Sequence, residues 1–188
     1  MPVYQATTRL AADTLMIIHP RQGVQISPID LSRASLLLDL RRDLERFVIS
    51  LASQRASDAQ RRQFRHIANL LKTSESLTIS EFNAYDSKID QMVLSACGEP
   101  FLQYTLRPLH TIFRRIGWVY HSYTAGGESL DSTVEGHIAV LDAILSGKPE
   151  QAALASDKLI DFVKDMLPVL SDELPPSVFD VRMEFKQP

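Results

Sequence analysis

The sequence has little that would cross-link the chain or attach it to a membrane. Cys97 is the one cysteine in 188 residues, which excludes an internal disulfide and a zinc finger built on a cysteine cluster. The first 20 residues contain no long uncharged apolar run, so neither a secretory signal nor a membrane span is recognisable there. These absences predict a protein of a reducing compartment, and we expect it in the cytoplasm with no membrane partner.

The net charge of the chain is also small. A net charge of −3 argues against a protein that binds nucleic acid by overall electrostatic attraction, although it leaves room for a local DNA-reading element. Apolar residues make up 45% of the chain and charged residues 23%, which is ordinary for a globular protein with a buried core. The length fits one domain, or one domain with a small appendage.

The first 29 residues differ in pattern from the rest. Residues 2–15 predict a short helix, and two β-like runs at 16–18 and 24–26 flank a turn that contains Pro20 and Gly23. A helix followed by a hairpin looks like half of a winged helix-turn-helix. This segment is too small to bury a core alone.

From residue 31 onward the apolar spacing is helical throughout. The expected helices cover residues 31–54, 59–73, 81–97, 100–120, 130–146 and 150–167. The predicted fold is all-α, an antiparallel bundle of about six helices over residues 30–170. On the first of these helices, the expected inward stripe is Leu37, Leu40, Leu44, Phe47, Val48 and Leu51. Pro168, Pro175 and Pro176 predict an irregular tail, and we assign residues 171–188 to it.

The helix at 81–97 places two carboxylates on a face that should be buried. Asp86 lies inside its apolar stripe and Asp90 follows one turn later. A buried carboxylate needs a partner. The candidates are Arg41, which points inward on the first bundle helix, and His137, which occupies a core position. A further polar row on the fourth bundle helix consists of His110, Arg114 and His121.

Four stretches resemble the effector-binding FCD domain of FadR-type regulators in the GntR family. They are residues 38–45 (LDLRRDLE), 86–100 (DSKIDQMVLSACGEP), 135–144 (EGHIAVLDAI) with 147–152 (GKPEQA), and the last amphipathic helix. Residues 2–26 resemble the recognition helix and wing of the family's winged helix, which normally has two more helices before this point. The winged helix therefore looks truncated.

The resemblance implies a transcriptional regulator that binds DNA, forms a homodimer and responds to a small carboxylate effector. Gln5, Arg9 and Arg21 are then the DNA-binding residues, although Tyr4 stands where the family usually has an arginine that contacts DNA.

The resemblance also implies a metal site. In the family, an aspartate and three histidines hold a divalent ion (zinc, nickel or manganese), which binds an organic acid together with nearby arginines. By position the ligands here are Asp86, Asp90 and His137, while the fourth position is the apolar Leu159. The alternative is a metal-free pocket in which Arg41 or Arg114 binds the effector alongside Asp86 and His137.

Plainer readings of the same residues stay open. His137 is then a hydrogen-bonded core histidine, Asp86 a structural ion-pair partner of Arg41, and Asp90 a solvated carboxylate. Arg41 and Glu45 are one turn apart and can pair with each other.

Two other functions compete with a regulator. One is a degenerate helical dimer or interaction module that binds neither DNA nor effector. The other is a helical metalloenzyme, which the absence of a Glu-x-x-His pair disfavours because Glu135 and His137 have the wrong spacing.

Overall fold

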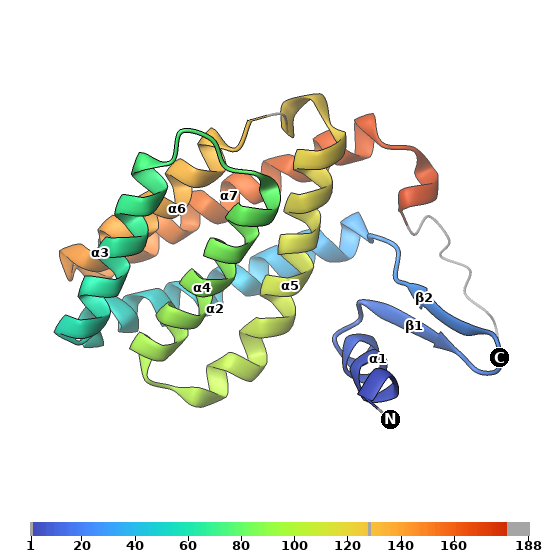
Figure 1. The fold of residues 1–188 in the computed structure, drawn as a ribbon, viewed down its shortest axis with the longest axis horizontal. Coiled ribbons are helices and arrows are strands. Elements are labelled where there is room, and N and C mark those ends of the chain that lie inside the picture. The colour runs from blue at the N-terminus through green and yellow to red at the C-terminus, as the bar shows by residue number, and fades with distance from the viewer. Residues whose placement is uncertain (1, 128, 180–188) are drawn as a thin grey trace.

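The computed structural model describes residues 2–127 and 129–179, and these residues form seven α-helices and one hairpin (Figure 1). The elements in chain order are α1 (Pro2–Ala12), β1 (Met16–His19), β2 (Gly23–Ile26), α2 (Leu31–Arg55), α3 (Asp58–Thr73), α4 (Ile79–Cys97), α5 (Pro100–Tyr123), α6 (Asp131–Ser146) and α7 (Pro149–Glu173). The predicted fold class, a mainly helical bundle preceded by a short helix and hairpin, is confirmed.

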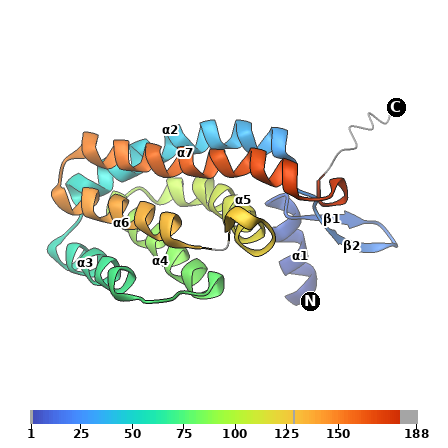
Figure 2. The ribbon, with the colours of Figure 1, turned by 90° about the horizontal axis from the view of Figure 1, so that it is seen from above.

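The bundle is built around the antiparallel pair α2 and α7, which lie side by side along their length (Figures 1 and 2). On one side of this pair, α6 packs against α7 and α3, and α4 packs against α2 and α5. One apolar core lies among α2, α3, α4 and α6 and includes Phe64, Leu141 and Ile144. A second lies where α2, α5 and α7 meet, around Leu38 and Ile160.

Local signals account for the helix boundaries. Ser57 with Gln60, and Thr78 with Glu81, form capping boxes at the starts of α3 and α4. Gly147 ends α6 with a φ of 72°, a left-handed conformation that glycine adopts without a steric penalty. The breaks expected between the bundle helices therefore lie within three residues of their predicted positions.

The N-terminal segment forms as predicted but ends its helix earlier. Helix α1 stops at Ala12 rather than at residue 15, because Thr14 takes a φ of 62°. The strands pair antiparallel, with Met16 opposite Ile26 and His19 opposite Gly23. Helix α1 has no buried residue, so its apolar side chains contribute little to a core.

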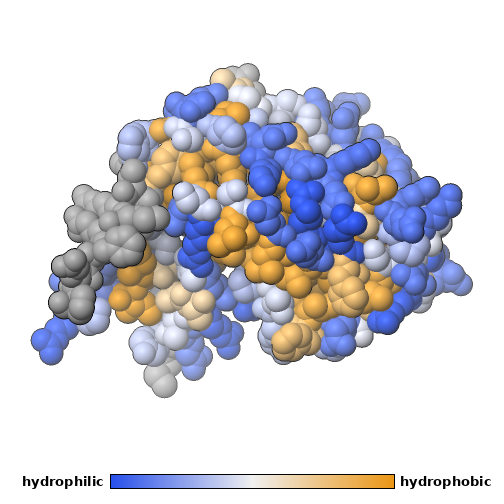
Figure 3. Space-filling model, turned by 180° about the vertical axis from the view of Figure 1, so that it is seen from behind, coloured by the Kyte–Doolittle hydropathy of each residue, from blue (hydrophilic) through white to orange (hydrophobic). Residues whose placement is uncertain are grey.

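Two expectations for the bundle helices are wrong. Leu40 and Phe47 were expected to point inward, but they are 49% and 55% exposed, while Arg41 and Glu45 are buried on the same helix. Apolar patches accordingly interrupt the polar surface on the face where α2 and α7 lie (Figure 3). The inward face of α2 is thus rotated relative to the stripe that apolarity alone predicts.

Helix α7 also continues past the predicted end at residue 167, through Pro168 to Glu173. Proline in a helix leaves the carbonyl four residues earlier without its donor. Pro168 is exposed, so the freed carbonyl of Lys164 has access to water. The expected irregular tail lies partly outside the described residues, since it includes residues 180–188. Across the described residues, no helix combines the length and the apolarity that crossing a bilayer requires.

Candidate functional site

Arg114 on α5 joins the two carboxylates of α4. Its Nε donates to Asp86 Oδ2 at 2.7 Å, and its Nη2 donates to Asp90 Oδ2 at 2.6 Å. The three side chains are between 14% and 21% exposed, so Asp90 is not the solvated carboxylate of the plainer reading. The cation opposite Asp86 is therefore Arg114, and the expected pair between Asp86 and Arg41 does not form.

His137 completes the contacts of Asp86 from α6. Its Nε2 lies 3.1 Å from Asp86 Oδ1, and its Nδ1 lies 2.7 Å from the carbonyl oxygen of Thr133. Both ring nitrogens thus face acceptors, an arrangement that suits the doubly protonated ring. Burial disfavours that charged form, but the hydrogen bond and charge of Asp86 outweigh it and raise the pKa of His137.

The two carboxylates of α4 differ in their affinity for a proton. Burial acts to raise the pKa of Asp86, but His137 and Arg114 outweigh it and hold that pKa well below its usual range. For Asp90, burial and the negative charge of Asp86 raise the pKa to about 6, although His110 opposes the shift. Asp86 is therefore the anchored anion, and Asp90 is the carboxyl group that can accept a proton near neutral pH.

A second group of charged side chains centres on Arg41 and Glu45 of α2. Arg41 Nε donates to Glu45 Oε1 at 2.5 Å, which confirms the one-turn pair considered from the sequence. His110 Nε2 lies 3.1 Å from the same Glu45 oxygen, while its Nδ1 lies 3.1 Å from Asp90 Oδ2. Burial opposes ionisation of Glu45, but the charge of Arg41 and the hydrogen bond from His110 lower its pKa to about 2. His110 thus links the two groups into one ionic network.

Two small cavities adjoin this network. One has a volume of about 50 Å³ and is lined on its ionic side by Arg41, Asp86, Asp90, His110, Arg114 and His137. The other, on the side of Glu45 and Ile49, has about 30 Å³. Leu159 of α7 borders both, and Gly136 lets α6 approach it, since a Cβ at Gly136 would lie 2.9 Å from Leu159 Cδ1.

The arrangement does not suit a divalent metal ion. Asp86 and Asp90 already share a cation, the guanidinium of Arg114, whose fixed positive charge would repel a second one. Leu159, at the fourth ligand position, has no donor atom. Within the described residues, no three side chains of His, Cys, Asp or Glu converge so that they could hold an ion.

The remaining candidates lie away from the network. His121 lines the larger of these two cavities, where it is held by the carbonyl of Gly127 and the hydroxyl of Thr133, each at 2.9 Å, and no described residue forms an ion pair with it. Gln5 and Arg9 on α1 and Arg21 in the hairpin turn are all exposed. Their accessibility is compatible with contacts to DNA.

The sequence did not reveal that Glu45 and Asp90 share His110. The available signal was that His110 precedes Arg114 by one helical turn, so both face the same neighbours. Helical spacing places them on one face of α5 but does not say which carboxylates of α2 and α4 lie opposite.

Comparison with known proteins identifies the helical body. The FCD domain matches residues 36–162. Among solved structures, the fold is similar to that of E. coli McbR/YncC, with a TM-score of 0.75 and 14% identity over 91% of this chain and 81% of that one. It is also similar to Streptococcus agalactiae GntR, with a TM-score of 0.57 and 18% identity over 87% and 80% of the two chains. No curated protein matches the sequence.

Proposed function

The chain belongs to the FCD domain family, and we propose that it binds a small organic acid within its bundle and thereby alters the DNA binding of a homodimeric cytoplasmic regulator. FCD domains are the effector-binding domains of GntR-type transcriptional regulators, which are not enzymes. Family membership therefore excludes the helical metalloenzyme that the sequence left open. The ionic network supports both the proposed class of effector and the proposed way in which it acts.

The observation that carries the proposal is the position of Arg114 between Asp86, Asp90 and the cavity. Burying this many ionisable groups is costly, and a purely structural core could use apolar residues of similar volume at no loss of stability. A guanidinium group also matches a carboxylate in both shape and charge. Arg114 is thus the residue that would bind an acidic effector, while Asp86, itself held by His137, keeps Arg114 in place.

The raised pKa of Asp90 supplies a way to admit a second anion. When Asp90 takes up a proton, it gives up its charge and releases one face of Arg114. The carboxylate of the effector then takes the place of Asp90 at Nη2, while Asp86 keeps its contact with Nε. Arg41 adds positive charge from α2 without leaving Glu45. The effector would therefore bind together with a proton.

The size of the cavity makes the conformational response unavoidable. A volume of about 50 Å³ holds only a few water molecules, so an organic acid needs α4 and α5 to move away from α6 and α7. An effector that binds only the open arrangement shifts the population toward it. Helix α5 also contacts the N-terminal segment, and its movement would change the position of Gln5, Arg9 and Arg21 relative to DNA.

A screen of small mono- and dicarboxylates by thermal unfolding tests this function. At least one acid should raise Tm in proportion to the logarithm of its concentration, as expected for a ligand of the folded state. The response should disappear in Arg114→Gln and persist in Arg65→Gln, a matched change on the exposed face of α3. If every acid that stabilises the wild type stabilises Arg114→Gln as strongly, the assignment of Arg114 is contradicted.

The small volume of the cavities favours one second candidate, a bundle that serves only as a dimer or interaction module. Every charged group of the network finds a partner within the chain, so no ligand is needed to satisfy it. A dimer in sedimentation equilibrium that no carboxylate stabilises would support this candidate over the sensor.

A further inference from the structure

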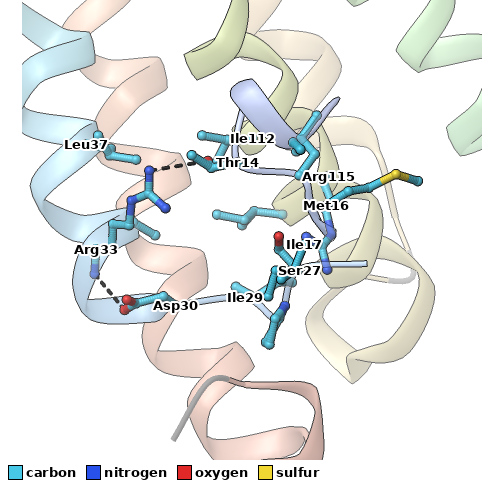
Figure 4. Close-up of a pocket in the computed structure, with 15 residues that line it drawn as sticks. Thr14, Met16, Ile17, Ser27, Ile29, Asp30, Arg33, Leu37, Ile112 and Arg115 are labelled. Carbon is cyan, nitrogen blue, oxygen red and sulfur yellow. Dashed lines mark hydrogen bonds between the residues drawn. The ribbon is translucent and has the colours of Figure 1, made fainter. Parts of the chain in front are cut away.

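A cavity of about 320 Å³ lies between the N-terminal segment and the bundle (Figure 4). Its walls come from α1, the hairpin and its linker on one side, and from α2 and α5 on the other. It shares no lining residue with the cavity beside Asp86. Its volume falls at the lower end of the range of small-molecule sites, roughly 300–1,000 Å³. It is therefore a separate site, and large enough for a ligand without rearrangement.

The walls of this junction cavity are mainly aliphatic. The apolar side chains that line it include Leu15, Ile17, Ile29, Leu37, Ile112 and Ile116. They come from both parts of the chain, so a ligand with an apolar body would contact the N-terminal segment and the bundle together. Burial of apolar surface would supply the main part of its affinity.

The charged side chains of the junction cavity are predominantly positive. Arg33 donates to the hydroxyl of Thr14 at 3.2 Å, a neutral partner that leaves its charge uncompensated (Figure 4). Arg115 makes no hydrogen bond or ion pair with any described residue, and burial lowers its pKa. Among the described residues, Asp30 is the only carboxylate lining the cavity, and its Oδ1 accepts the backbone N–H of Arg33 as the cap of α2. The cavity therefore suits a single negative charge on the ligand.

Few contacts hold the N-terminal segment across this cavity. Besides the contact between Arg33 and Thr14, Arg107 of α5 lies 3.5 Å from Asp13, and α1 has no buried residue. A molecule filling the cavity would add contacts to both sides at the point where the segment meets the bundle. Its binding would fix the orientation of one relative to the other.

We propose that the junction cavity binds a monocarboxylate with an apolar body, such as an arylalkanoate, and that this ligand holds the N-terminal segment against the bundle. The carboxylate lies at Arg115 and Arg33, and the apolar body lies against Ile112 and Ile17. This site is independent of the ionic network around Arg114, so the two can be tested separately.

Calorimetric titration of the chain with 4-phenylbutyrate tests the site. We expect saturable binding that is weakened about tenfold, or roughly 1.4 kcal/mol, in Arg115→Gln. Ala11→Phe, which narrows the cavity from α1, should weaken it as well without disturbing the bundle, because α1 has no buried residue. Arg114→Gln and Arg65→Gln should bind as the wild type does, and 4-phenylbutanol should bind more weakly than the acid.

Three results would overturn the proposal. The first is an absence of saturable binding to the wild-type chain. The second is equal binding of the acid by the wild type, Arg115→Gln and Ala11→Phe. The third is loss of binding in Arg114→Gln alone, which would assign the acid to the bundle cavity.

Hydrogen exchange supplies an independent readout, since bound ligand should slow exchange in residues 2–26, and unchanged exchange there would contradict the fixed orientation.

Discussion

Arg114 on α5 lies against Asp86 on α4, with Nε 2.7 Å from Oδ2, and the same guanidinium reaches Asp90 one turn later. The family resemblance predicted a metal ion at this point between the carboxylates. Here a side chain of the protein supplies the positive charge instead. The pocket therefore retains the carboxylates of an ion-binding centre, and its cation can bind an anion directly.

Removing that cation should destabilise the bundle. In Arg114→Leu, Asp86 and Asp90 lose the cation that they share in a mostly buried site, and breaking such a pair typically costs about 3–5 kcal/mol. Urea unfolding at pH 7 should show the loss as a lower midpoint with little change in slope. The double variant Arg114→Leu with Asp90→Asn should recover part of it. A loss no greater than that of Arg65→Leu would show that Arg114 has no role in stability.

The raised pKa of Asp90 predicts an unusual dependence of stability on pH. Its pKa is about 6 in the folded protein and 3.8 in a free carboxyl, so between these values the folded state holds a proton that the unfolded chain has lost. The contribution of Asp90 to stability therefore falls as pH rises from about 4 to about 6. Two pKa units correspond to about 3 kcal/mol.

Asp90→Asn should remove the loss of stability that the wild type shows as pH rises from about 4 to about 6. We expect the free energy of unfolding of the variant, relative to the wild type, to rise by up to about 3 kcal/mol between pH 4 and pH 7. Asp43→Asn, at an exposed position of α2, should track the wild type. The comparison is cleanest between about pH 4.5 and pH 6.5, because the lowered pKa of Glu45 affects stability only below about 4.5, and the raised pKa of His137 only above about 6.5. A constant difference between Asp90→Asn and wild type would contradict the shift.

Zinc and nickel should bind no more tightly to the wild type than to Asp86→Asn. The charge of Arg114 and the side chain of Leu159 both work against a divalent ion at this site. Equilibrium dialysis with metal analysis measures the bound ions per chain. One tightly bound ion in the wild type that is lost in Asp86→Asn would restore the metal site.

Much of the fold could be predicted because its signals are local. The capping pairs Ser57 with Gln60 and Thr78 with Glu81, and the glycine at 147, fix helix boundaries within a few residues of sequence. Pro168 led to the wrong prediction that α7 ends at residue 167. The free-energy cost of a proline within a helix depends on its exposure, because water can hydrogen-bond to the carbonyl that an exposed proline leaves without a donor.

The partners within the site could not be predicted in the same way. Spacing correctly placed Asp86, Asp90 and His137 toward the interior, since a helical face follows from a period of 3.6 residues, and it put Arg114 in a polar row beside the apolar stripe of its helix. It offered Arg41, and not Arg114, as the cation beside Asp86. That choice depends on how α2, α4 and α5 are rotated against one another, and the rotation is set by packing over the whole core. The outward position of Leu40 and Phe47 on α2 has the same origin.

The most direct test of the account is the number of protons taken up when an acidic effector binds. Titration calorimetry at pH 7 in buffers of different ionisation enthalpy measures this number. If the effector takes the place of Asp90 at Arg114, the wild type should take up about one proton per acid bound, and Asp90→Asn should take up about none. Equal proton uptake by the two proteins, or binding that Arg114→Gln leaves unchanged, would contradict the account.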